Sequence, residues 1–350
     1  FVFNKQSGRY APIRHQNRFI YLPDKISPDD LFERYMHKIV HCYYGDCAAG
    51  HLASDGLTPS QKKVREFQKA YFAEVYPIIR GASESAIDAV KTFLKRFNFT
   101  TGDSELFANE ALETATQKYS FELTNSALAL EILEDLTHIY KYFRLEDASP
   151  FGGKFPIKPS FELVDERAIE FLRNSDNFYF GRYFSDPQTQ ESLKKWLTNE
   201  YMRSGRNLRD PGEMSKFIKR FQGRVNQEDY KILRVVETTT NRARNWGNIF
   251  TVEEAQGATI EITGPMDNVT CSWCKGMIGK QFKVDAVVRQ VKDVIISSPE
   301  DLPLLNPFLP GRIDKDMVAD ISEDHLLAQG IALPPYHPHC RHGYVVDQFK

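Results

Sequence analysis

The sequence lacks the features that most often reveal a membrane protein or a common class of enzyme. No apolar run among its 350 residues approaches the roughly 18 that a membrane span requires, so we expect no membrane partner. The motifs G-x-S-x-G, H-E-x-x-H and G-x-G-x-x-G and the Walker lysine loop are all missing. We therefore expect a protein without enzymatic activity.

Net charge and cysteine are also scarce. The formal net charge is −2, which gives the molecule no overall attraction for nucleic acid, so any DNA contact has to come from a local patch. The five cysteines are few and odd in number for so long a chain, which argues against a disulfide framework and for a reducing compartment. With 41% hydrophobic and 26% charged residues, the composition is typical of a soluble globular protein with a sizeable core.

The first half of the chain carries helical patterns. Residues 1–26 are polar and rich in turns, and we interpret them as an extended arm with little structure of its own. A helical domain is predicted over residues 27–148, with helix starts at Ser27-Pro28 and Thr58-Pro59, where a capping hydroxyl precedes a proline at the first helical position. The stretch 149–160 is dense in proline and glycine and is interpreted as a linker.

The predicted second domain, residues 161–350, begins with helical patterns and ends with strand patterns. Helical spacing continues from about residue 164 to 255, with one break at Asp210-Pro211. Short strands are then predicted at 258–263, 281–284 and 343–346. Between them, the segment 284–296 fits either a helix or a strand, and the proline-rich segment 299–310 is interpreted as a loop.

Cysteine and histidine residues in this second domain have the spacing of a zinc site. Cys271 and Cys274 form a C-x-x-C knuckle, and two thiolates on such a tight turn can reach one metal ion. Far along the chain, His337 and Cys340 follow with H-x-x-C spacing. Four protein ligands leave no position for a catalytic water, so we predict a structural site. Without the tail, the knuckle could equally be a redox pair or two buried hydrophobic residues.

The long loop between the two halves of the predicted site indicates that a zinc ion would act as a structural cross-link. Residues 275–336 separate the halves, and a cross-link that closes such a 62-residue loop removes about 4 kcal/mol of unfolded-chain entropy. Three prolines within 334–338 stiffen the tail before metal arrives. The fourth ligand is open: His337 is preferred, His342 is the next alternative and His339 the last, because alternate residues of an extended tail face opposite ways. The fold is therefore predicted to be α+β, with a mainly helical N-terminal half and a zinc-clipped C-terminal domain of helices and a few short strands.

A second group of metal-binding residue types crowds the N-terminal part, namely His37, His41, Cys42, Cys47 and His51. His37 and His41 are four residues apart and would share one face of a helix. The group is a candidate for a second metal site. The alternative is an exposed helix end, where histidines interact favourably with the negative terminus of the helix dipole.

Several motifs of the second domain occur together in one family of phage proteins. They are R-V-V-E-T from Arg234, N-R-A from Asn241, Asp267 shortly before the knuckle, then Gly279 and Phe282, and finally P-P-x-H-P-x-C-R. In this combination, over about residues 160–350, the chain resembles the phage Mu F-like head morphogenesis family, which are minor head proteins of tailed phages. The family motif falls on Cys271, Cys274, His337, Pro338, Cys340 and Arg341. Where the family often has a second cysteine after the arginine, this chain has His342.

The resemblance implies a minor capsid protein inside the head near the portal vertex, and in the host cytoplasm during assembly. Such a protein would aid head assembly, DNA packaging or DNA delivery, with the portal protein and other head proteins as partners. The alternatives are a zinc-dependent nuclease or phage-delivered effector enzyme, which an open metal position beside a carboxylate would favour, and a cellular zinc-containing adaptor.

Basic residues are concentrated in the stretch 203–244. Residues 201–250 contain five acids and eleven bases, the bases being Arg203, Arg206, Arg209, Lys216, Lys219, Arg220, Arg224, Lys231, Arg234, Arg242 and Arg244. This surplus is a candidate contact for packaged DNA or for an acidic portal surface. Alternatively, these bases contact no partner and form a helical face exposed to solvent. Arg234 and Glu237, three residues apart, either pair on such a helix or form a catalytic pair in a cleft.

Overall fold

The structure, a computed structural model, describes residues 2–4, 9–11, 57–99, 102–226, 230–267, 270–310, 312–338 and 340–349. These residues form a mainly helical protein with a small three-stranded antiparallel sheet, so the predicted α+β class is confirmed. The predicted helix start at Ser27 lies outside the described residues. None of the described helices is both long enough and apolar enough to cross a membrane.

Three helices follow the pattern predicted for the first half: α2 (Pro59–Arg96), α3 (Ser104–Thr124) and α4 (Leu128–Leu145). Thr58 caps α2 as predicted, because its side chain accepts a hydrogen bond from the backbone N–H of Gln61 and the Gln61 side chain accepts one from the backbone of Thr58. Apolar residues that recur at helical spacing along α2, such as Tyr71 and Val75, are buried.

The described part of the arm is more ordered than the sequence indicated, whereas the linker is as expected. Within the arm, β1 (Val2–Asn4) and β2 (Arg9–Ala11) pair antiparallel, so a part expected to have little structure forms a short two-stranded sheet. Valine and aromatic residues in these segments favour such pairing. In the linker, the 3-10 turn η1 (Ser149–Phe151) is followed by an irregular connection, as the prolines and glycines predicted.

The next helices are α5 (Leu163–Gly181), α6 (Pro187–Ser204), α7 (Pro211–Asn226) and α8 (Tyr230–Glu254), with the 3-10 turn η2 (Gly205–Arg209) before α7. The predicted break at Asp210 is confirmed, because its carboxylate accepts hydrogen bonds from the backbone N–H groups of Gly212 and Glu213 and so starts α7. Asp186 likewise accepts a hydrogen bond from the backbone of Thr189 at the start of α6.

The three predicted strands are confirmed as one antiparallel sheet in the order β4-β3-β5, made of β4 (Gln281–Lys283), β3 (Gly257–Thr263) and β5 (Gly343–Phe349).

The segment 284–296, which fitted either a helix or a strand, is a helix, α10 (Val284–Ile295), whose valines are buried on one face. The segment 299–310 is not wholly a loop, since it holds η3 (Pro299–Asp301) and α11 (Leu302–Leu305). Ser298 caps η3, because its side chain accepts a hydrogen bond from the backbone N–H of Glu300. The remaining short helices are α9 (Ser272–Met277), η4 (Val318–Asp320) and α12 (Glu323–Ala328).

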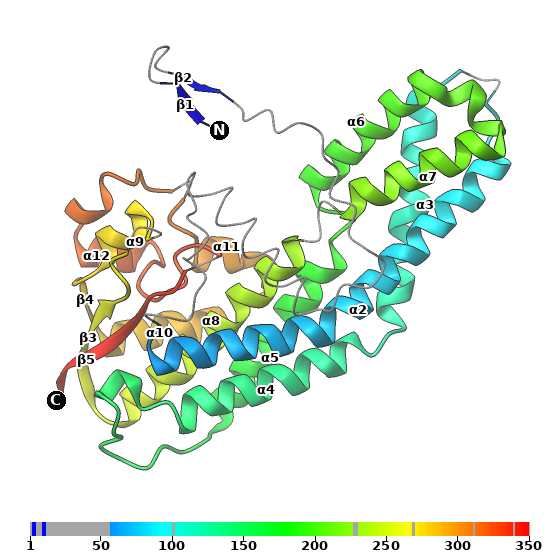
Figure 1. Ribbon diagram of the computed structural model, residues 1–350. Coiled ribbons are helices and arrows are strands. Elements are labelled where there is room, and N and C mark those ends of the chain that lie inside the picture. The colour runs from blue at the N-terminus through cyan, green and yellow to red at the C-terminus, as the bar shows by residue number, and fades with distance from the viewer. Residues whose placement is uncertain are drawn as a thin grey trace.

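Figure 1 shows an elongated molecule with α2 running along much of its length. At one end, α3, α6 and α7 gather around α2, and the rings of Phe107 and Tyr201 pack there with their centroids 4.8 Å apart. At the other end lies the sheet with α9 and α12, while α4, α5 and α8 lie between (Figure 1). The sheet end is the part that carries the predicted zinc ligands.

Helices α4 and α8 cross at very short range. A Cβ added to Gly247 would lie 3.1 Å from the backbone N of Arg144 and 3.2 Å from the carbonyl O of Tyr140. Both of these atoms belong to the backbone and cannot rotate away, so any larger residue at Gly247 would force the two helices apart. The absence of a side chain on α8 is what allows this crossing.

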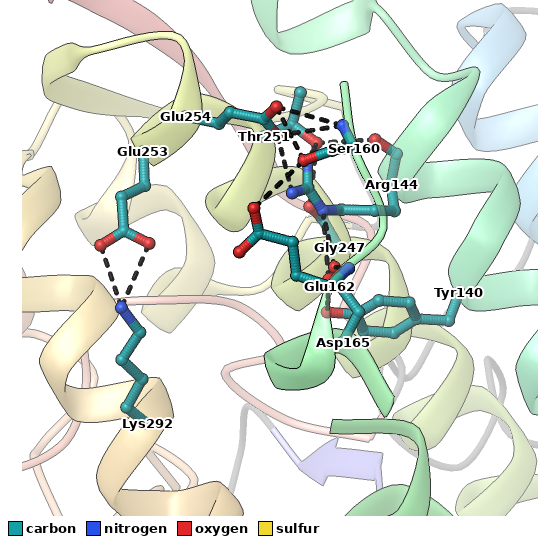
Figure 2. A network of polar contacts seen from close by, with 10 residues as sticks. All are labelled: Tyr140, Arg144, Ser160, Glu162, Asp165, Gly247, Thr251, Glu253, Glu254 and Lys292. Atoms are coloured by element: carbon teal, nitrogen blue, oxygen red, sulfur yellow. Dashed lines mark hydrogen bonds and ion pairs between the residues drawn. The ribbon is translucent and has the colours of Figure 1, made fainter. Parts of the chain in front are cut away.

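Arg144 is the centre of a buried polar network beside this crossing (Figure 2). Its Nε donates to Asp165 at 3.1 Å, its Nη1 to Thr251 at 2.8 Å and its Nη2 to Glu254 at 2.8 Å. The hydroxyl of Tyr140 also donates to Asp165, at 2.9 Å. The network joins α4 to α5 and α8, and one continuous hydrophobic core runs through residues on both sides of the linker. The division into domains 27–148 and 161–350 stays a prediction.

Candidate metal centre

The C-x-x-C knuckle lies at the start of the short helix α9. Cys271 is the N-cap of this helix, and its sulfur accepts a hydrogen bond from the backbone N–H of Cys274 at 3.5 Å. After the helix, Gly279 has a φ of +82°, a conformation that favours glycine. Its N–H donates to the carbonyl of Ile262 on β3 at 2.9 Å. These contacts hold the knuckle against the sheet.

The tail segment is fixed by α8 and by a turn of its own. The side-chain N–H of Asn245 on α8 donates to the carbonyl of Pro334 at 3.0 Å. The backbone N–H of Cys340 donates to the carbonyl of His337 at 3.1 Å, which closes a turn between the two predicted ligands. His337 and Cys340 are thereby brought to one side of the tail.

The knuckle and the tail meet although they are far apart in the sequence. The Sγ of Cys274 lies 3.0 Å from Nε2 of His337 and 3.8 Å from Sγ of Cys340. The Sγ of Cys271 lies 3.3 Å from the same imidazole nitrogen. Bonds of about 2.3 Å to sulfur and about 2.0 Å to nitrogen put neighbouring donors of tetrahedral zinc roughly 3.5 to 3.8 Å apart. The observed spacings are close to what one such ion requires.

A fifth donor, His342, lies beside these four. Its Nδ1 is 3.9 Å from Sγ of Cys340, and the ring occupies the space where a Cβ at Gly264 would lie, 2.2 Å from Cδ2. Two groups have donor atoms within 4.8 Å of one another, namely Cys271 with Cys274 and His337, and Cys274 with Cys340 and His342. Because the groups share Cys274, these five side chains form one cluster that could hold a metal ion. The choice between His337 and His342 as fourth ligand stays a prediction.

Hydrogen bonding within the cluster sets the protonation of its thiols. A hydrogen bond from Cys274, together with the His337 imidazole, lowers the pKa of Cys271 to about 4 despite its burial. Burial opposes ionisation of Cys340, but hydrogen bonds to Cys274 and His342 hold its pKa well below the ordinary value. The pKa of Cys274 is raised because it shares its proton with both of these neighbours and is itself buried. The lowered pKa values of Cys271 and Cys340 favour the thiolate, the form that binds metals.

The imidazole of His337 responds to the same charges. Burial alone would lower its pKa, but the hydrogen bond with Cys271 and the nearby Cys340 thiolate raise it. The carboxylate of Glu237, which is buried on α8, acts in the same direction. Glu237 thus lies within electrostatic reach of a predicted ligand, whereas its pairing with Arg234 stays a prediction.

An ion pair joins the two halves of the site outside the donor cluster. Arg341 donates to both carboxylate oxygens of Asp267, at 2.8 and 2.7 Å. It also donates to Oγ1 of Thr270 at 3.3 Å, while its carbonyl accepts a hydrogen bond from the Gln61 side chain on α2 at 3.2 Å. Both members of the pair belong to the motifs that resemble the phage family, so these motif positions are neighbours in space.

The long segment between the two halves is folded. The indole N–H of Trp273 donates to the carbonyl of Ile313 at 3.0 Å, and the Lys280 ammonium donates to the carbonyls of Ala319 and Ile321 at 3.2 and 2.6 Å. Residues 275–336 contain α10, α11 and α12, so they pack as part of the sheet end. The knuckle is therefore held from both the sheet and this segment.

Other predicted ligands cannot be placed. His339 lies outside the described residues, as does the N-terminal group of His37, His41, Cys42, Cys47 and His51. A second metal site there stays a prediction, and so does the last alternative for the fourth ligand.

The basic stretch 203–244 is largely built into the fold. Arg242 and Arg244 are buried in α8, so the alternative of a solvated face is wrong for these two residues. Four further bases form ion pairs within the chain, namely Arg203, Lys216, Arg220 and Lys231. The sequence reasoning missed Arg244 as a residue of the site. No sequence signal identified it, because a charged helix position normally faces solvent. Its burial on α8, together with Thr240 and Asn248, shows only in the structure.

Comparisons with protein-family models, with curated proteins and with solved structures found no match to this chain. Sequence or fold similarity therefore does not show its family. The functional argument depends on the motifs and on the geometry that brings them together.

Proposed function

We propose that this protein is a minor capsid protein of a tailed phage, of the Mu F-like head morphogenesis type, with a structural zinc ion held by Cys271, Cys274, His337 and Cys340. The observation that carries the proposal is the 3.0 Å distance between Sγ of Cys274 and Nε2 of His337, residues 63 positions apart. Motif positions that are scattered in the sequence thus form one compact centre. That is the arrangement expected if the resemblance to the phage family is genuine.

The chemistry of the donors supports zinc. Three thiol groups and an imidazole are soft or borderline donors, which favour zinc over magnesium or calcium. Cys274, Cys340 and His337 are buried, with exposures of 1%, 2% and 8%. Four protein ligands in a buried setting complete a tetrahedral sphere, so the ion would fasten the tail to the knuckle and perform no reaction.

The proposed partners are the portal protein and other head proteins, at the inner face of the capsid near the portal vertex. There the protein would aid head assembly, DNA packaging or DNA delivery. Packaged DNA is a further proposed contact of the stretch 203–244. The structure offers this contact limited support, because at least six of its eleven bases are buried or paired within the chain.

The enzymatic alternative needs a metal with an open position and a carboxylate that acts as general base. Neither donor group found among the described residues contains an aspartate or glutamate. A zinc-dependent nuclease or effector is therefore the weaker proposal. Incubating the purified chain with DNA and RNA, with and without EDTA, tests it; EDTA-sensitive cleavage that Cys274→Ser abolishes would establish the enzyme in place of the structural protein.

Quantitative mass spectrometry of purified phage particles tests the proposed location. The protein is expected in a few copies per particle, and it should stay with particles after a density gradient. The Cys274→Ser chain is expected to be depleted from particles, whereas Lys292→Met, a change at an exposed residue outside the cluster, should be incorporated normally. A chain found in the cytoplasm and missing from particles would support the cellular adaptor and overturn the capsid proposal.

A further inference from the structure

A buried arginine lies beside the metal cluster without enough hydrogen-bond acceptors. Arg244 on α8 is only 7% exposed, and its Nε and Nη1 have no hydrogen-bond partner among the described residues. Burial lowers its pKa below the ordinary arginine value, but an arginine side chain keeps its charge at neutral pH. A guanidinium in such a place is costly unless negative charge lies close by.

The position of Arg244 shows where that negative charge is. A Cβ added to Gly343 would lie 3.0 Å from Nη2 of Arg244, so the guanidinium packs against the backbone just after Cys340 and His342. The groups that act electrostatically on the guanidinium are, in decreasing order, the Asp147 carboxylate, the Tyr344 phenol and the Cys340 thiol. The guanidinium thus lies between the start of β5 and the end of α4.

Of these groups, Asp147 already has other donors. It accepts hydrogen bonds from the hydroxyl of Ser60 at 2.8 Å, from the backbone of Ser149 at 3.1 Å and from the side chain of Asn248 at 3.4 Å. The Tyr344 hydroxyl is neutral at ordinary pH and donates to the carbonyl of Asn245 at 2.7 Å. Asp147 is thus already hydrogen-bonded on several sides, and the cluster around Cys340 is the other site of negative charge that this cation can compensate.

The proposed site also has a charge that requires compensation. A divalent zinc ion with three thiolates and a neutral imidazole carries a net charge of −1. In a buried setting such a charge is stabilised strongly by a fixed cation nearby, because the local dielectric is low. Partners behind the metal ligands commonly set metal affinity in this way.

We propose that Arg244 is the counter-cation of the metal–thiolate cluster, compensating its negative charge from behind Cys340 and so raising its affinity for zinc. This inference rests on the proposed zinc site. Arg244 acts through the ligands and is a positioning and charge-compensating residue; it would not bind the metal. Asp147, just after α4, acts on the same guanidinium, which therefore lies within electrostatic reach of both the cluster and the end of α4.

The test compares Arg244→Met with Arg242→Met in the full chain. Arg242 is two residues away on the same helix and equally buried, but it faces Asn306 and the ring of Phe308. Zinc affinity is measured by competition with a chromophoric chelator, after circular dichroism has established the folded fraction. Arg244→Met should weaken zinc binding by about tenfold or more, and Arg242→Met by less than about twofold.

A spectrum of the cobalt-loaded chain separates charge compensation from loss of packing. Removing a cation near the thiolates raises the energy of the sulfur electrons, so the sulfur-to-cobalt charge-transfer band should move to longer wavelength in Arg244→Met and stay in place in Arg242→Met. If Arg244→Met does not fold, Arg244→Lys, which keeps the charge but displaces it, should move the band the same way by less. An unchanged band in the folded variant, or equal zinc loss in both methionine variants, overturns the inference. A wild-type chain that takes up no zinc would instead overturn the proposed site itself.

Discussion

Arg341 holds the carboxylate of Asp267 with two hydrogen bonds, of 2.8 and 2.7 Å, although the residues lie 74 positions apart. The pair spans the same two segments as the proposed zinc ion, so with zinc bound the tail would be fastened to the knuckle region by two independent interactions. A bidentate ion pair of this kind gives geometric specificity as well as energy. It would hold the donors near one another before a metal binds.

Breaking this ion pair should cost a modest amount of stability. Its side chains are partly exposed, at 31% and 44%, so the coupling energy in a double-mutant cycle of Asp267→Asn and Arg341→Gln should be roughly 0.5–1 kcal/mol. Urea unfolding of the four proteins measures it, with and without zinc. A coupling of zero in both series would show that the pair does not hold the halves together.

The close crossing of α4 and α8 predicts opposite effects at two glycines. Gly247→Ala should destabilise the fold by about 1–3 kcal/mol, because its new methyl group would meet the backbone of Arg144 and Tyr140 at 3.1–3.2 Å. Gly81→Ala, in α2 with nothing within 4 Å, should stabilise it by about 0.5–1 kcal/mol. Thermal and urea unfolding give both values. Equal effects at the two positions would contradict the crossing.

The buried network of Figure 2 predicts a large loss when its centre is removed. Arg144→Met leaves the fully buried Asp165 without its cation, at a cost of about 3–5 kcal/mol. The matched control is Lys292→Met, which breaks the exposed pair with Glu253 and should cost less than about 1 kcal/mol. If the two variants unfold at the same urea concentration, the network contributes no more than a surface pair.

Asp135 predicts a dependence of stability on pH. Burial, followed by the nearby Glu74, Glu131 and Glu134 carboxylates, raises its pKa to about 7. Because the folded chain holds this proton more tightly than the unfolded chain, the contribution to stability is greatest below about pH 4 and is lost as the pH rises through 7. Since the carboxyl is partly solvated, the expected loss is roughly 1–2 kcal/mol.

Asp135→Asn stays neutral and should not show this loss. Unfolding free energies at pH 5 and pH 8 should therefore differ by less in the variant than in the parent chain. Glu74→Gln, which removes one of the neighbouring charges, should have a smaller effect in the same direction. A parent chain whose stability rises over this range relative to Asp135→Asn would contradict the raised pKa.

Much of the fold follows from local sequence signals. Thr58 and Asp210 start helices because capping and proline preferences act over a few residues. The strand at 258–263 was predictable from β-branched alternation, but the helix over 284–295 was ambiguous. There the same valines suit a helix face or a buried strand, and only packing decides which forms.

The metal-binding residues of the site were predictable from the sequence, but the buried residues packed around them were not. Spacing alone indicated Cys271, Cys274, His337 and Cys340, since few other functions need that pattern. The burial of Arg244 could not be predicted, because a charged helix position normally faces solvent. It became visible only with the tail packed against α8.

The central claim is that two distant segments share one ion, and zinc K-edge X-ray absorption of the purified chain tests it most directly. The account predicts about one zinc per chain with three sulfur ligands at about 2.3 Å and one nitrogen ligand at about 2.0 Å. A chain without zinc, or an ion bound by only two sulfurs, would mean that the knuckle and the tail do not share a metal, and the account would be contradicted.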